Sequence, residues 1–186
     1  MAAHTLKDNN PPIVVGSIGE EVDIDTWNSF RYGSNAKFNG NYNFTYHSYS
    51  GGTNLVQSFT KNGYMIESMV TGRTSTLYYE RKSGNTFYQY SAVGNEWLRE
   101  ETTLNLQNIY TSRIVDELYV HMFDFENYEY NTDDGKYYYL DYGFGTQVMF
   151  QNGYLTHLFY ALGTNIFEIK LSFETTINIP KSYYYK

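Results

Sequence analysis

Apolar and polar residues alternate along most of the chain from residue 38 onward. Tyr42, Phe44 and Tyr46 are separated by single polar residues, a period of two that is typical of a half-buried strand. Turn signals rich in Gly and Asn then recur roughly every ten to twelve residues, the spacing of an up-and-down meander. The segments between them are rich in aromatic and β-branched residues and predict strands at residues 55–60, 64–70, 76–81, 86–91 and 96–102.

The alternation stops at residues 104–125, which contain no Gly and no Pro. Apolar residues recur there three and four apart, which predicts an amphipathic helix. The strand pattern then resumes and predicts strands at residues 126–131, 136–142, 147–151, 154–161 and 165–175. The chain is therefore expected to form about eleven strands, divided by one helical insertion.

The predicted strand number sets the expected architecture. A sheet of about eleven strands curls rather than staying flat, and one of its faces has to be buried. We therefore expect a mainly β fold, a strongly curved antiparallel half-barrel with the helix of residues 104–125 packed in its concave face.

The two ends of the chain are expected to lie outside this sheet. Residues 1–23 are polar and include Asn-Asn-Pro-Pro, which predicts a flexible linker before a single domain at residues 24–186. Asp23 or Asp25 is expected to cap a short helix that carries Trp27. The last residues, 183–186, are expected to be a mobile end.

Composition narrows the classes of function. Aromatic residues make up 19% of the chain, including 22 Tyr, and they suit half-buried pleated surfaces. The net charge of -7 argues against general nucleic-acid binding. The absence of Cys excludes disulfides, thiolate metal sites and Cys nucleophiles.

Catalytic and metal-binding motifs are missing from the sequence. It contains no Gly-x-Ser-x-Gly, no phosphate-binding glycine loop and no EF-hand spacing. The four histidines, His4, His47, His121 and His157, do not have the spacing of metal ligands. We therefore expect a protein that is not an enzyme, with no catalytic residues, no metal and no cofactor.

Three segments resemble a known family. These are the short helix with Trp27, the sequence Asn-Tyr-Asn-Phe-Thr at residues 41–45, and Phe-Glu-Thr-Thr-Ile-Asn-Ile-Pro at residues 173–180. Together they resemble bacterial lipoproteins with the LolA-like (LppX-like) half-barrel fold. The resemblance implies an exported protein of the bacterial envelope or exterior, held at a membrane only through a lipid anchor that has been removed. It also implies a lipid or another hydrophobic small molecule, or an envelope protein, as partner, although the many tyrosines differ from the aliphatic cavities of lipid carriers.

The leading hypothesis is a non-enzymatic binding protein that holds a hydrophobic or amphipathic ligand between the helix and the inner strand residues. The residues expected to line this space are Trp97, Tyr110, Ile114, Leu118, Met122, Tyr139, Phe150 and Phe159.

Three alternatives remain open. A structural or adhesive domain would bind another protein through exposed tyrosines. A calycin-like closed barrel would hold a small ligand, with its helix outside the barrel. A hydrolase would gather two carboxylates from distant strands at a spacing of roughly 5 to 10 Å.

Overall fold

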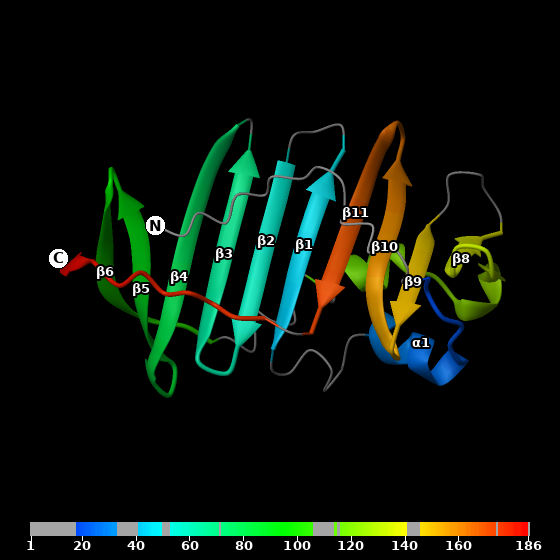
Figure 1. Cartoon of the computed structure of the whole chain (residues 1–186), viewed down its shortest axis with the longest axis horizontal. Helices are drawn as coiled ribbons and strands as arrows, with labels where there is room; N and C mark the ends of the chain where they lie inside the picture. Colours follow the sequence, from blue (N-terminus) through cyan, green and yellow to red (C-terminus); the bar gives the residue numbers. More distant parts are fainter. Residues whose placement is uncertain are drawn as a thin grey trace.

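The computed structural model describes residues 18–32, 41–49, 53–70, 72–105, 114, 116–140, 146–173 and 175–185. Among these residues it shows one curved, open sheet of twelve strands with short helices beside it (Figure 1). The mainly β, curved antiparallel fold expected from the sequence is confirmed. The sheet does not close, which contradicts the alternative of a calycin-like barrel. Its strands are β1 (Tyr42–Ser48), β2 (Thr53–Thr60), β3 (Gly63–Val70), β4 (Arg73–Ser83), β5 (Thr86–Val93), β6 (Glu96–Thr103), β7 (Tyr128–Asn131), β8 (Lys136–Tyr139), β9 (Gln147–Gln151), β10 (Tyr154–Leu162), β11 (Asn165–Ser172) and β12 (Tyr184–Tyr185).

Two antiparallel meanders build the sheet. Strands β1 to β6 form one meander and β7 to β11 the other, and they join where β1 pairs with β11. Hairpin turns match the sequence signals. Asn152 and Gly153 between β9 and β10 both have positive φ, as a tight two-residue turn of this kind requires.

Strand β12 is the departure from this pattern, because it pairs in parallel with β6. The expectation of a mobile end at residues 183–186 is therefore wrong for Tyr184 and Tyr185. Three strands are shorter than expected, and one of them, β11, ends at Ser172 instead of residue 175. A 3-10 turn, η2 (Phe125–Asn127), precedes β7, and β8 ends at Tyr139.

One face of the sheet, which we call the inner face, carries the hydrophobic core. A ladder of stacked aromatic rings crosses four strands on this face, from Tyr42 to Phe59 (4.7 Å between centroids), Tyr64 (4.5 Å) and Tyr79 (5.5 Å). The register places each of these residues directly opposite the next. Such cross-strand aromatic pairs stabilise a sheet beyond simple burial. The opposite face is called the outer face.

Helix α1 (Ile24–Arg31) covers one end of the inner face (Figure 1). The Asp23 side chain accepts a hydrogen bond from the Thr26 backbone N–H and caps the helix, as expected. Trp27 and Phe30 are fully buried. The Trp27 indole N–H also donates to the Phe123 carbonyl at 3.0 Å, which satisfies its one polar atom inside the core.

A second helical segment, made of Ile114 and residues 116–121, packs against the inner face, as predicted. Ile114, Leu118 and Met122 are fully buried at helical spacing, and the Tyr160 hydroxyl of β10 donates to Glu117 Oε2 at 3.0 Å. The helix is shorter than expected, because residues 104–105 and 122–124 are not helical. Residues 106–113 lie outside the described residues.

The chain is packed against the sheet already from Gly19, within the predicted linker. The Glu20 N–H donates to the Phe150 carbonyl at 2.8 Å, and Tyr137 bonds both backbone groups of Val22. Gly19 lies so close to Gly135 that a Cβ atom on it would clash with the Gly135 carbonyl oxygen. Residues 19–23 therefore belong to the packed domain.

Candidate functional site

The C-terminal segment, residues 175–185, crosses the outer face from β11 to β6, and we call it the strap (Figure 1, red). Residues 175–183 have no regular secondary structure. The strap is fixed at its far end by Arg99 of β6, whose guanidinium donates to the Tyr183 hydroxyl at 2.7 Å. The same guanidinium lies 4.5 Å from the Tyr183 ring centroid and 4.6 Å from that of Tyr185. Each such cation–π contact contributes about 0.5–1 kcal/mol at an exposed site.

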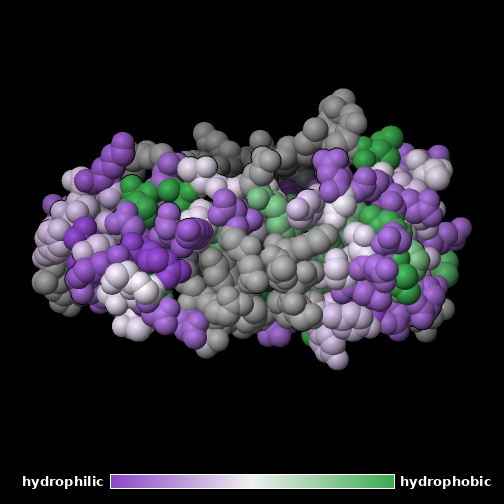
Figure 2. Space-filling model, turned by 90° about the horizontal axis from the view of Figure 1, so that it is seen from below, coloured by the Kyte–Doolittle hydropathy of each residue, from purple (hydrophilic) through white to green (hydrophobic). Residues whose placement is uncertain are grey.

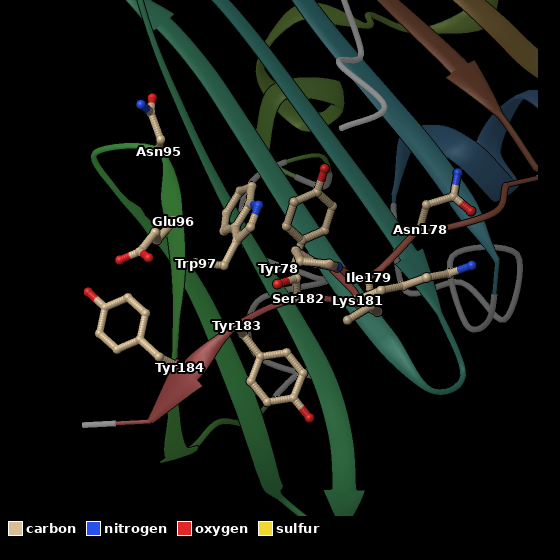
Figure 3. Close-up of a pocket in the computed structure, with 11 residues that line it drawn as sticks. Tyr78, Asn95, Glu96, Trp97, Asn178, Ile179, Lys181, Ser182, Tyr183 and Tyr184 are labelled. Atoms are coloured by element: carbon tan, nitrogen blue, oxygen red, sulfur yellow. The ribbon is translucent and has the colours of Figure 1, made fainter.

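A pocket of about 620 Å³ lies between the strap and the outer face (Figure 3). This volume falls in the range of small-ligand sites, about 300–1,000 Å³. The sheet contributes one wall and the strap the other. The lining residues are Tyr78, Asn95, Glu96, Trp97, Asn178, Ile179, Pro180, Lys181, Ser182, Tyr183 and Tyr184.

Aromatic rings form the sheet side of this pocket. Trp97 and Tyr78 make an edge-to-face contact with centroids 5.5 Å apart, and both are half-buried. Their rings lie side by side next to the strap in Figure 3. Burial raises the pKa of the Tyr78 phenol, with a further contribution from the Glu67 carboxylate. Its hydroxyl therefore keeps its proton and can donate a hydrogen bond at neutral pH.

Polar side chains form the rim of the pocket. Asn95 comes from the turn before β6 and Glu96 is the first residue of β6, whereas Asn178, Lys181 and Ser182 come from the strap. All five are exposed, and no hydrogen bond or ion pair joins their side chains to another described residue. The pocket thus combines an aromatic wall with a set of donors and acceptors that are open to a ligand.

The structure divides the eight residues predicted to line a ligand space. Ile114, Leu118, Met122 and Phe150 meet in the core on the inner face, all fully buried, and Tyr139 packs against them half-buried. Phe159 and Trp97 lie on the outer face, because Phe159 pairs with Glu168 and alternates with core residues, and Trp97 shares the face of Arg99. These two do not line the inner face. Tyr110 lies outside the described residues.

A second group of titratable side chains lies on the outer face around Glu168, which is 1% exposed. The Tyr49 hydroxyl donates to Glu168 Oε2 at 2.5 Å. Glu168 Oε1 has no hydrogen-bond partner among the described residues; His157 Nε2 and Lys170 Nζ each lie 3.9 Å away. Burial lowers the pKa of His157 to about 4, helped by the charges of Lys170 and Lys136. The pKa of Lys170 is also lowered by burial.

The buried carboxylates of the outer face do not form a glycosidase pair. Glu67 of β3 and Glu168 of β11 are separated by β2 and β1. Three strand spacings place them roughly 14 Å apart, which exceeds the separation that glycoside hydrolysis uses, about 5 to 9.5 Å. Within the described ranges, no three His, Asp or Glu residues gather as a metal site. None of the helices described there has the length and apolar character needed to cross a membrane.

Comparison with known proteins adds no relationship: the chain matches no protein-family model and no curated protein sequence. The class of the protein therefore rests on its own geometry, which is that of an open, curved antiparallel sheet with helices on the inner face and a strap on the outer face.

Sequence reasoning missed the strap side of the pocket. The available signal was the alternation of Ile177 and Ile179 with polar residues, followed by Pro180. This pattern indicates an extended segment with one apolar side. It does not indicate which of many sheet surfaces that side covers.

Proposed function

We propose that this protein is a non-enzymatic binding protein that holds a small amphipathic ligand in the pocket between the strap and the outer face. The observation that carries the proposal is a pocket of about 620 Å³ that combines Trp97 and Tyr78 with polar rim side chains, none of them bonded to another described residue. Apolar walls with a few oriented polar groups are the usual composition of ligand sites.

The burial of the inner face favours this pocket over the space beneath the helix. Ile114, Leu118 and Met122 have no exposed surface and belong to the same core cluster as Phe150. A ligand there would have to displace packed side chains, and a close-packed core resists added volume at a cost of about 1–3 kcal/mol. The strap pocket requires no such displacement.

Location at the bacterial cell envelope is also part of the proposal, and it is supported by the resemblance to LolA-like lipoproteins. Fractionation of the native cells, followed by detection with an antibody against the chain, tests it. Recovery of the protein in the cytoplasmic fraction would refute the envelope location. It would not affect the proposed binding site.

A thermal-shift screen tests the binding function. The full chain would be screened against oligosaccharides, lysolipids, fatty acids and aromatic metabolites, because a ligand that binds the folded state alone raises the melting temperature. We expect at least one compound to stabilise the wild-type protein, and we expect Trp97→Ala to abolish that shift.

Tyr119→Ala is the matched control for this screen. Tyr119 is an aromatic residue that is 64% exposed on the second helix, away from the pocket, so its variant should respond as the wild type does. The proposal fails if no compound shifts the wild type, or if the hits persist in Trp97→Ala.

A further inference from the structure

The charges and the rim chemistry of the strap pocket indicate the class of its ligand. Glu96 and Lys181 are the charged residues of the lining, one of each sign. Their charges balance, so the lining residues together carry no net charge. This balance favours a neutral ligand.

The wall of the pocket is not that of a lipid site. Its aliphatic residues are Ile179 and Pro180, and the other apolar surface is aromatic. An acyl chain is best held by a continuous apolar cavity that excludes water, whereas Asn178 and Lys181 of this lining are exposed. An aromatic ring face instead suits a ring-shaped ligand that is apolar on its face and polar at its edge.

Sugar rings have this chemistry. A pyranose presents C–H groups on its faces, and its rim of hydroxyls both donates and accepts hydrogen bonds. Asn95 and Asn178, on opposite walls, each carry an amide that can donate to one hydroxyl and accept from another. The protonated Tyr78 hydroxyl and that of Ser182 add further partners.

From this geometry we infer that the strap pocket binds a neutral oligosaccharide, with a sugar ring packed on Trp97 and Tyr78 (Figure 3). The inference rests on the proposed function and names its ligand class. An oligosaccharide is favoured over a free sugar because the rim residues of both walls are exposed. Further sugar units can therefore extend from the pocket into solvent. Asn178 of the strap and Asn95 of the turn before β6 would hold the ring edge from opposite sides.

Isothermal titration calorimetry with four neutral probes tests the inference: cellohexaose, maltohexaose, xylohexaose and mannohexaose. We expect at least one to bind the full chain. Trp97→Ala should weaken this binding by roughly tenfold or more, in line with the contribution of an aromatic platform. Asn178→Ala should weaken it as well, and Tyr119→Ala should leave it unchanged.

A fluorescence titration checks the same binding independently of any variant. Trp27 is fully buried in the core, whereas Trp97 is half-buried in the pocket. A bound sugar should therefore change the emission of the more exposed tryptophan, and the change should saturate with the calorimetric affinity.

The other outcomes separate this inference from the proposed function. Binding of decanoate or lysophosphatidylcholine that depends on Trp97, with none of the four sugars bound, would overturn the carbohydrate assignment and leave the binding function standing. Hexagalacturonate is an anionic oligosaccharide. If it bound more tightly than every neutral probe, the inference that the ligand is neutral would be wrong. Failure of all these probes, together with a negative thermal-shift screen, would overturn both.

Discussion

At the scale of single residues, the surroundings of His157 on the outer face determine the protonation state of its imidazole. Its ring is mostly shielded from solvent, and the positive charges of Lys170 and Lys136 oppose a further charge on it. Glu168 Oε1 lies 3.9 Å from its Nε2 atom, too far for a direct hydrogen bond. Burial and like charge therefore outweigh the nearby carboxylate, and the imidazole is neutral at pH 7.

This protonation state predicts a specific loss of stability in acid. The pKa of His157 is about 4 in the folded protein against 6.5 for the ordinary side chain. The unfolded chain therefore binds the proton first, and stability present above pH 6.5 is lost as the pH falls toward 4. By pH 5 this loss amounts to about 2 kcal/mol.

The loss of stability in acid can be measured by urea denaturation of the wild type and of His157→Gln at pH 7 and pH 5. The variant should lose about 2 kcal/mol less between the two pH values, because it has no imidazole to protonate. Equal losses in both proteins would show that His157 is not the group responsible.

At the scale of elements, the second helix and the strap stabilise opposite faces of one sheet. The helix buries Ile114 and Leu118 in the core, and Met122 directly after it is buried there as well. The His121 ring stacks on Tyr160 with 3.7 Å between the ring centroids. The strap is held at its far end by contacts between Arg99 of β6 and the strap residues Tyr183 and Tyr185. The helix therefore contributes mainly to folding, whereas the strap shapes the candidate site.

Shortening one helix residue tests this assignment. Leu118→Ala removes a fully buried side chain and should lower the free energy of unfolding by about 2–5 kcal/mol. Val120→Ala is the matched control, because Val120 is 56% exposed on the same helix, and its effect should stay within about 0.5 kcal/mol. Urea denaturation monitored by circular dichroism measures both, and similar effects of the two substitutions would refute the packing of this helix on the sheet.

At the scale of the whole molecule, a single core joins the two meanders. The core cluster runs from Phe87 on β5 to Tyr128 on β7, through the β1–β11 junction. On the face seen in Figure 2, the described apolar residues lie in small separate groups among hydrophilic ones, as expected where most apolar surface is buried. One continuous core predicts that the two meanders unfold together.

A comparison of two probes in one variant tests this cooperativity. In Trp97→Phe the remaining tryptophan, Trp27, reports on the end of the sheet near α1, whereas far-ultraviolet circular dichroism reports on all strands. Their urea midpoints should coincide. A lower midpoint for the circular dichroism signal would mean that the β1–β6 meander unfolds on its own.

Local patterns were sufficient to predict most elements. The alternation of Tyr42, Phe44 and Tyr46 predicted a strand, and Asn152-Gly153 predicted a hairpin, because both depend on neighbours in sequence. The face of each strand was harder to assign. Trp97 is followed by Leu98 and Phe159 by Tyr160, so both faces of each strand carry an apolar residue there and apolar character alone could not tell inside from outside.

By itself the sequence determined the mainly β fold, the hairpin order and a helix cap at Asp23 or Asp25, since periodicity, turn chemistry and capping act over a few residues. Only the tertiary structure decided that β1 pairs with β11, that Tyr184 and Tyr185 reach β6, and that a pocket opens beneath the strap. These features join residues far apart along the chain. Their position depends on how the whole sheet curves, which no local pattern encodes.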